Sequence, residues 1–405
     1  MTDPIDERLI KTYLKKTIQL SLAGTTLELG ISQTLFSSHE VDTGTLHLLK
    51  TLQTNVPDIV TKILDLGCGY GPLGLFLAQT HPGSQVHLVD RDALALLFAK
   101  HNATANEIAE TEVYASLGYD GVTDDDFDLI VSNIPGKAGE AVIEAMLLDA
   151  QEHLRETGMV AVVVVSPLES FVEETLTQPG VEIVLHKTMS AHAVFHYRFL
   201  EPGHGDRRPA FGRGVYDREA LTFVLDDLTF SMHTAQGLPE FDTLSYETEL
   251  LIKALRDLET PSVTKAVVFN PGQGHIPVIL WRLLAPHAID LVDRDLLSLR
   301  TSRMNLIENG CPPSSLGEFH QVKLAPPDTD VDLIVGILRE SEGPEAIEYG
   351  LAEAALHLRP GGLCLIGGGS TPVTRVLKSK TIARYLRPLK RKRSKGNSTA
   401  LLRRR

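Results

Sequence analysis

A glycine-rich turn is the first place where this sequence could do chemistry. In the stretch KILDLGCGYG, Asp65 closes a short apolar run and is followed at once by Gly67, Gly69 and Gly71. Glycines permit positive φ and let a ligand approach the backbone closely. A second carboxylate, Asp90, ends the next apolar run, at about the 20-residue distance where such folds place an acid on ribose hydroxyls. This spacing predicts a nucleoside ligand without a pyrophosphate.

Two other interpretations of the glycine turn stay open at this point. Gly69, Gly71 and Gly74 also satisfy the dinucleotide pattern Gly-x-Gly-x-x-Gly, and an isolated glycine-rich turn can serve packing alone, with no ligand. The second acid, Asp90, favours the nucleoside interpretation. Cys68, inside the turn, is expected to be a small buried filler and not a nucleophile.

Apolar strands alternating with helices surround the turn and must position it. The expected strands are 63–66, 86–89, 112–115, 127–132 and 160–165, and the expected helices between them are 72–79, 94–106 and 140–154. A polar turn between two apolar segments at 181–199 predicts a closing hairpin. This order predicts an α/β fold, Rossmann-like and doubly wound, with a mostly parallel sheet and a C-terminal antiparallel hairpin. Asp65 would then face the crevice at the carboxyl ends of the strands.

The segment that precedes the turn has weaker signals. Residues 7–22 have apolar spacing compatible with a helix, and residues 26–29 are typical of a short strand. A polar, turn-rich stretch at 35–45 leads into an expected helix at 46–52.

The second half of the chain repeats the first. The stretch LVDRD at 88–92 recurs unchanged at 291–295, an offset of 203, and DLIV at 128–131 recurs at 332–335, an offset of 204. A register held over several blocks indicates a tandem duplication of one domain. We therefore expect two domains, 1–200 and 219–405, joined by a linker at 201–218 that is rich in glycine, proline and charge.

The second copy lacks most of the residues that could bind a ligand. Opposite Asp65, Gly67 and Cys68 stand Val268, Asn270 and Pro271. The acid opposite Asp90, Asp293, persists and is expected to be structural or solvated. We therefore predict that the active site lies in residues 1–200 and that the degenerate second copy is a scaffold or recognition domain.

Charge is distributed unevenly along the 405 residues. The formal net charge is −13, yet no acid follows Glu353, and residues 354–405 contain 14 Lys and Arg, which leaves −27 for residues 1–353. A basic end attracts phosphates, whereas an acidic body repels them. Lys390 to Lys395 can be a solvated tail or a localisation signal. The repeat register predicts a folded basic hairpin there instead.

Composition narrows the protein class. The sequence is 43% apolar and 22% charged, as in an ordinary globular protein. No apolar run approaches the length of about 18 residues needed to span a membrane. The three cysteines, Cys68, Cys311 and Cys364, have no metal-ligand spacing. These features predict a cytoplasmic protein with no membrane partner and no bound metal.

Together, Asp65-Leu-Gly-Cys-Gly-Tyr-Gly, Asp90, Ala115-Ser116 and Ser132-Asn133-x-Pro135 resemble class I S-adenosylmethionine-dependent methyltransferases. The set is most similar to the "methyltransferase small domain" group, which includes bacterial rRNA guanine-N2 methyltransferases with tandem domains. The segment Phe36-Ser37…Asp42-x-Gly44-Thr45 is similar to that group's element just before the cofactor loop. The resemblance implies S-adenosylmethionine as cofactor, bound by Asp42, Gly44, Thr45, Asp65, Gly67, Gly69, Gly71, Asp90, Ala115 and Ser116.

The resemblance also implies a role for the loop after the strand at 127–132. In the family, an Asn-Pro-Pro-aromatic loop holds a planar amino group through the Asn side-chain oxygen and a backbone carbonyl, so Asn133, Ile134 and Pro135 would be the catalytic residues. The loop departs from the family pattern at two places. Ile134 replaces the first proline, and Gly136-Lys137 replaces the aromatic residue that would stack on a flipped base.

Three functions follow as hypotheses. The first is an N-methyltransferase acting on an exocyclic or amide nitrogen, with rRNA guanine-N2 as the first substrate to test. The second is methylation of protein glutamine or a small molecule, because such a loop can hold any planar amide. The third is a non-catalytic cofactor-binding or scaffold protein. If RNA is the partner, the basic residues expected to contact it are Arg384, Arg387, Lys390, Arg391, Lys392 and Arg393.

Overall fold

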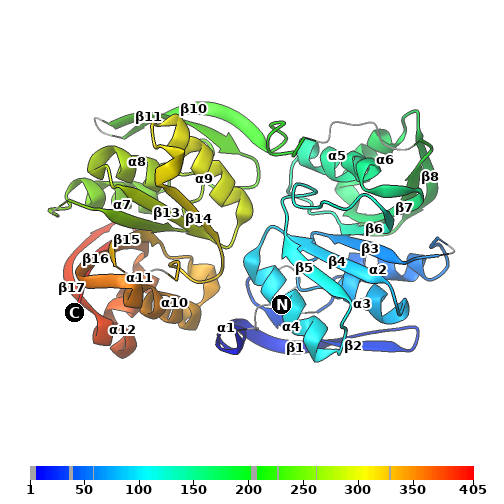
Figure 1. Cartoon of the computed structure of the whole chain (residues 1–405), viewed down its shortest axis with the longest axis horizontal. Coiled ribbons are helices and arrows are strands. Elements are labelled where there is room, and N and C mark those ends of the chain that lie inside the picture. The colour runs from blue at the N-terminus through cyan, green and yellow to red at the C-terminus, as the bar shows by residue number, and fades with distance from the viewer. Residues whose placement is uncertain are drawn as a thin grey trace. The chain divides into compact units, whose positions relative to one another are not determined.

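The computed structural model describes residues 6–35, 40–57, 59–201, 208–225, 228–260, 262–327 and 330–405. The chain divides into two compact units, Met1–Tyr216 and Asp217–Arg405 (Figure 1). The Phe36-Ser37 element singled out in the sequence lies outside the described residues.

A seven-stranded sheet forms the core of the first unit, in the order β5-β4-β3-β6-β7-β9-β8. Its strands are β3 (Lys62–Leu66), β4 (Gln85–Asp90), β5 (Thr111–Ala115), β6 (Phe127–Asn133), β7 (Leu154–Val165), β8 (Val181–Thr188) and β9 (His192–Phe199). The first five strands of that order run parallel, and β9 and β8 pair antiparallel at the edge. The predicted Rossmann-like sheet with a closing hairpin is confirmed.

Helices pack against this sheet between the strands (Figure 1). They are α2 (Thr43–Leu52), α3 (Pro72–Thr80), α4 (Ala93–Ala105), α5 (Glu140–Leu148) and α6 (Glu169–Leu176). The helix expected at 140–154 is shorter than predicted, because a 3-10 turn (Asp149–Glu152) follows it and Leu154 already pairs with Phe127 as the first residue of β7. α6 was not predicted.

The expected helix at 7–22 is wrong beyond its first two turns. Only Glu7–Tyr13 is helical (α1); the chain then forms a hairpin of β1 (Leu14–Leu22) and β2 (Thr25–Ser32). The turn at Ala23 and Gly24 has positive φ at both residues, 49° and 84°. Two such residues match the right-handed twist of paired strands, so this local turn favours a hairpin over a continued helix.

The second unit repeats the sheet and the preceding hairpin of the first, without a counterpart of α1 and with one additional helix, α12 (Lys380–Tyr385). Its sheet has the order β14-β13-β12-β15-β16-β18-β17, and a separate hairpin, β10 (Asp217–Leu225) with β11 (Leu228–Ala235), matches β1 and β2. The other strands are β12 (Lys265–Phe269), β13 (Ala288–Asp293), β14 (Leu316–His320), β15 (Val331–Ile337), β16 (Leu358–Gly369), β17 (Leu386–Ser394) and β18 (Asn397–Arg404). The helices are α7 (Tyr246–Arg256), α8 (His275–Leu284), α9 (Leu296–Glu308), α10 (Pro344–His357), α11 (Ser370–Lys378) and α12 (Lys380–Tyr385). The predicted tandem fold is confirmed.

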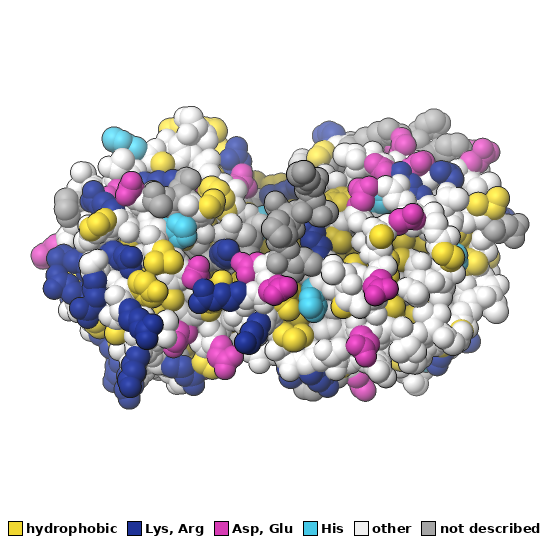
Figure 2. Space-filling view, turned by 60° about the horizontal axis from the view of Figure 1, so that its bottom comes forward, with side chains coloured by type: hydrophobic (Ala, Val, Ile, Leu, Met, Phe, Trp, Pro, Cys, Tyr) yellow, Lys and Arg dark blue, Asp and Glu magenta, His cyan; other side chains and the backbone are white. Residues whose placement is uncertain are grey.

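The basic end of the chain is folded as the repeat predicted. β17 carries Lys390 to Ser394 and pairs antiparallel with β18, which in turn pairs with the central strand β16. In Figure 2, Lys and Arg side chains gather on the left, over this C-terminal unit. The alternative of a solvated tail is therefore excluded for residues 386–405.

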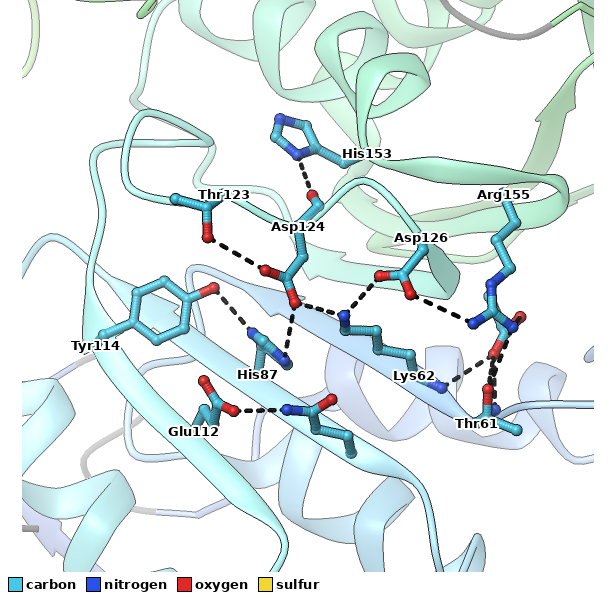
Figure 3. A network of polar contacts seen from close by, with 12 residues as sticks. Thr61, Lys62, His87, Glu112, Tyr114, Thr123, Asp124, Asp126, His153 and Arg155 are labelled. Carbon is cyan, nitrogen blue, oxygen red and sulfur yellow. Dashed lines mark hydrogen bonds and ion pairs between the residues drawn. The ribbon is translucent and has the colours of Figure 1, made fainter. Parts of the chain in front are cut away.

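A polar network ties the strands together at the edge opposite the glycine turn (Figure 3). The Asp128 carboxylate accepts the backbone N–H groups of Thr61 and Lys62, at 2.7 and 3.0 Å, and pairs with Arg155 at 2.9 Å. Lys62 also pairs with Asp124 and Asp126.

The same device recurs in the second unit. Asp332 accepts from the amides of Thr264 and Lys265, at 2.7 and 2.8 Å, and pairs with Arg359 at 2.7 Å. Because both copies have it, and only one copy has the residues of the glycine turn, we assign this network to the fold and not to ligand binding.

No helix in the described parts of the chain is both long enough and apolar enough to cross a membrane.

Candidate functional site

The glycine turn joins β3 to α3 with its three glycines in left-handed conformations. Their φ angles are 75° at Gly67, 58° at Gly69 and 90° at Gly71. A Cβ at Gly67 or Gly69 would meet nothing within 4 Å, whereas one at Gly71 would lie 2.9 Å from the Leu75 side chain. The first two glycines thus leave room for a ligand beside the backbone, and the third is required by packing.

Asp65 lies at the end of β3, directly beneath the turn. Its side chain is buried; Oδ2 accepts the Gly74 N–H at 2.7 Å, and Oδ1 is buried with no hydrogen-bond partner. Burial, reinforced by the negative charge of Asp90, raises the pKa of Asp65 to about 7, although the Gly74 bond opposes this shift. A buried, unpartnered acceptor is uncommon in a native fold and calls for an explanation such as a missing ligand.

Asp90 lies at the end of β4 and faces the same turn. Its Oδ2 accepts the Gly69 N–H at 2.9 Å and its Oδ1 accepts the Asp92 N–H at 2.8 Å, so the carboxylate is fixed toward the glycine loop. Burial raises the pKa of Asp90 to about 6. Each carboxylate oxygen has a second lone pair, so the group can still accept hydroxyl donors from a ligand.

Ala115 is the last residue of β5, the neighbour of β4, and Ser116 follows it. The Ser116 amide donates to the Asp90 carbonyl at 3.0 Å. The Ser116 hydroxyl donates to the Gly118 carbonyl at 2.6 Å and accepts the Gly121 N–H at 2.9 Å. The hydroxyl therefore shapes the loop that borders Asp90 and contributes to the site through its backbone.

Asn133, at the end of β6, joins two segments that are far apart in the sequence. Its Nδ2 donates to Asp42 Oδ2 at 2.9 Å and to Thr45 Oγ1 at 3.0 Å. The same Asp42 oxygen caps α2 by accepting the Thr45 N–H at 3.2 Å. A carboxylate only accepts hydrogen bonds, so the amide nitrogen must face Asp42, and Oδ1 points away as an acceptor.

The rest of the loop after β6, residues 134–137, differs from an Asn-Pro-Pro-aromatic loop. The Ile134 side chain is buried, and its N–H donates to the Val163 carbonyl at 2.9 Å, a bond that proline could not make. Pro135, Gly136 and Lys137 are exposed. The isoleucine thus anchors the loop to β7. Its backbone carbonyl remains available as an acceptor directly after Asn133.

Gly44 is required by close approach. A Cβ there would lie 2.8 Å from Asp42 Oδ2 and 2.8 Å from His192 Cδ2. The structure therefore brings the α2 residues 42, 44 and 45 to the same edge as Asn133.

Asn102 of α4, which no sequence motif indicated, supports the turn. Its Nδ2 donates to the carbonyls of Tyr70 and Gly30, and its Oδ1 accepts the Gly30 N–H at 2.7 Å. Asn305 makes the equivalent bonds to Gln273 and His233 in the second unit. The identity of these two asparagines at the repeat offset was the signal that could have found them.

The crevice of the second unit is filled by its own side chains. Asp293, the counterpart of Asp90, is buried, and its Oδ2 accepts from Ser298 Oγ at 2.7 Å and from an Arg339 nitrogen at 2.8 Å. Asn270, in the place of Gly67, donates to the Ile337 carbonyl at 2.9 Å. Asp293 is therefore structural, as one of the two expectations for it had stated.

Part of this architecture is found in a known protein family. Residues 27–183 match the sequence model of the family "Methyltransferase small domain". Over these residues the chain is similar to the methyltransferase small domain. The match includes the glycine turn, Asp90, the α2 cap and Asn133.

Curated relatives resemble this chain over about a third of its length. An uncharacterized protein of Bacillus subtilis, YbxB, is 34% identical over 131 residues, which are 32% of this chain and 64% of that protein. A ribosomal RNA small subunit methyltransferase C of Haemophilus influenzae is 36% identical over 134 residues, 32% of this chain and 39% of the relative. The chain thus spans less than two thirds of the length of these curated relatives.

One solved structure matches both units. The T. thermophilus 16S rRNA N2 G1207 methyltransferase, in complex with AdoMet and guanosine, has a TM-score of 0.65 and 17% sequence identity, covering 98% of this chain and 100% of that one. At this identity the likeness establishes the fold.

The first unit should be less stable at neutral pH than at about pH 4 because of the Asp65 carboxyl group. Its folded-state pKa of about 7 lies above the unfolded value of about 3.9, so between these pH values the folded state holds a proton that the unfolded state releases. The free energy of unfolding should therefore fall as pH rises from about 4 to about 7. Asp65→Asn should make this slope shallower by up to about 1.4 kcal/mol per pH unit, measured by urea denaturation at a series of pH values.

Asparagine keeps an oxygen for the Gly74 amide, so the variant isolates the ionisation. Asp125→Asn, at an exposed acid of the same unit, serves as the control and should retain the parent slope. An unaltered slope in Asp65→Asn would contradict the prediction.

Proposed function

We propose that this chain is an S-adenosylmethionine-dependent N-methyltransferase whose active site lies in the first unit. The observation that carries the proposal is the fixed amide of Asn133. Its nitrogen is held by Asp42 and Thr45, and its free oxygen lies at the same sheet edge as the glycine turn. This arrangement can hold a planar amine next to a bound nucleoside.

The residues of the turn fit the cofactor. The space beside Gly67 and Gly69, the unpartnered Oδ1 of Asp65 and the remaining lone pairs of Asp90 are features that a nucleoside ligand would use. Asp90 would accept the ribose hydroxyls, and the loop that begins at Ser116 would border the adenine. When bound, S-adenosylmethionine supplies an electrophilic methyl group on a sulfonium. The T. thermophilus structure, which was solved in complex with AdoMet, supports this assignment.

The chain's own contribution to the chemistry is positioning. Asn133 Oδ1 and the Ile134 carbonyl would each accept one N–H of the acceptor amine, which directs the nitrogen lone pair along a single line. Alignment of this kind can lower a barrier by several kcal/mol without a strong base. The bonds from Asp42 and Thr45 keep the amide from rotating, so the acceptor site is formed before the substrate arrives.

The first acceptor to test is a guanine exocyclic amine in small-subunit rRNA. The names of the Haemophilus relative and the T. thermophilus enzyme, which was solved with guanosine, support this choice. Labelled methyl transfer into RNA, protein and metabolite fractions from a strain lacking the gene would test it. Label in RNA supports the proposal, label in protein or metabolites identifies another acceptor, and no binding of S-adenosylmethionine would overturn it.

The basic hairpin is the surface we propose for RNA contact. Among the six cations that the sequence indicated, Arg391 donates to Thr374 and Ser398, and Lys392 pairs with Asp257, so both also serve the fold. The exposed members of the set are Arg384, Arg387, Lys390 and Arg393. These four can approach phosphates without breaking an internal bond.

Replacing these four residues with glutamine should weaken RNA binding and its dependence on salt. Each phosphate contact contributes about 0.7 to 0.9 to the slope of log K against log salt, so the slope should fall by up to about 3. The matched control replaces four exposed lysines of the first unit with glutamine: Lys11, Lys15, Lys16 and Lys100. Fluorescence anisotropy over a salt series measures both variants. Equal losses in the two would show a net-charge effect and contradict a dedicated surface.

A further inference from the structure

His192, the first residue of β9, lies next to the catalytic asparagine network. The point where a Gly44 Cβ would stand is 2.8 Å from His192 Cδ2 and also 2.8 Å from Asp42 Oδ2. That carboxylate oxygen is itself 2.9 Å from Asn133 Nδ2. The imidazole therefore lies beside the α2 cap, within one side chain of the amide that would hold the acceptor.

The sheet register places His192 on the same face as Asn133. Asn133 of β6 is paired with Val163 of β7, and Val165, two residues on, is paired with His192. Residues paired across strands share a face, as do residues two apart along one strand. All of these positions lie at the carboxyl edge, where the first unit has its glycine turn.

The surface next to this histidine is open where the family carries an aromatic residue. A Cβ on Gly136 would lie 3.1 Å from Val165 Cγ2, so the loop backbone lies against that valine. Val165 is 37% exposed despite its position at the end of a buried strand. Gly136 itself has no side chain to cover this apolar spot.

The His192 ring is not engaged elsewhere in the described structure. Its Nδ1 is buried without a hydrogen-bond partner, and the ring of His47 lies edge-on at a centroid distance of 6.2 Å. The half-buried His192 ring beside the exposed side chain of Val165 suits a planar heterocycle, whose π face can stack on an aromatic ring.

We propose that His192 and Val165 form the acceptor pocket, with the imidazole supplying the planar contact that Gly136 cannot. This inference rests on the proposed function and names the residue that determines its preference for a planar acceptor. His192 touches the acceptor, whereas Asp42 and Thr45 position Asn133.

The test compares His192→Ala and His192→Phe in the full chain, with Arg198→Ala as control. Arg198 is an exposed residue of the same strand that pairs with Glu182. RNA from a strain lacking the gene is the substrate, and guanosine is the binding probe, observed by saturation-transfer NMR in the presence of S-adenosylhomocysteine. Loss of one base–aromatic contact should raise KM for RNA and weaken guanosine binding by about tenfold in His192→Ala. His192→Phe and Arg198→Ala should stay close to the parent.

S-adenosylmethionine affinity, measured by calorimetry, separates the possible failures. A purely structural role for His192 would lower both cofactor affinity and Tm, would not be rescued by phenylalanine, and would overturn the inference. Parent-like KM and guanosine binding in His192→Ala would overturn it as well, with the proposed function intact. If the parent itself binds neither S-adenosylmethionine nor guanosine, the inference falls together with the proposed function.

Discussion

Replacing Asn133 with alanine should lower kcat for methyl transfer by about 10²- to 10³-fold and weaken S-adenosylmethionine binding by much less. Loss of a single preorganised polar contact at a reacting group has this magnitude in other enzymes. The amide touches Asp42 and Thr45, and no hydrogen bond links it to the glycine turn. The variant should therefore remove acceptor alignment and leave the glycine turn, Asp65 and Asp90 intact, so that only the contacts through Asp42 and Thr45 change on the cofactor side.

Two further variants sharpen this experiment. Thr45→Val removes one of the two acceptors that fix the amide nitrogen, so it should reduce kcat by less than Asn133→Ala does. Asn55→Ala, which deletes an amide bonded to the Thr51 carbonyl in the same unit, is the control and should leave kcat unchanged. Single-turnover transfer from labelled S-adenosylmethionine measures all three. Full activity in Asn133→Ala would exclude the proposed role of the loop.

Replacing Asp90 with alanine should abolish measurable S-adenosylmethionine binding, whereas the matched change at Asp293 should not affect it. Asp90→Ala removes the proposed ribose acceptors and leaves the amides of Gly69 and Asp92 without their partner. A hydrogen bond to a charged group contributes about 1.5 to 3 kcal/mol. Losing the two proposed bonds between the Asp90 carboxylate and the ribose hydroxyls should therefore weaken cofactor binding at least about 100-fold.

Asp293→Ala tests the same position in the degenerate copy. Its carboxylate is already occupied by Ser298 and Arg339, so we expect one cofactor per chain, in the parent and in this variant alike. The second unit should instead lose stability, on the order of 1 to 3 kcal/mol, because Arg339 loses the nearer of its two acidic partners, Asp293 and Glu342. Calorimetric stoichiometry and thermal unfolding measure both effects. Two sites per chain, or loss of binding in Asp293→Ala, would contradict the assignment of a single site.

Local patterns in the sequence were sufficient for most of the architecture. Strand and helix order follows from hydrophobic periodicity, which is a property of neighbouring residues. The one large error, the helix at 7–22, arose where periodicity was ambiguous and a two-residue turn of positive φ at Ala23 and Gly24 decided for a hairpin. The basic hairpin was predictable because residues 386–405 align, at the repeat offset, with the hairpin expected at 181–199 in the first copy.

The sequence by itself determined the duplicated fold, the glycine turn with its two acids, and the loss of that chemistry in the second copy. Each of these depends on residue type and spacing along the chain. Only the tertiary structure decided that Asn133 is held by Asp42 and Thr45, that Arg339 occupies Asp293, and that His192 stands beside the acceptor loop. These contacts join strands and loops that the strand order of each sheet brings together. The spacing of residues along the sequence does not specify which side chains meet at the carboxyl edge of a sheet.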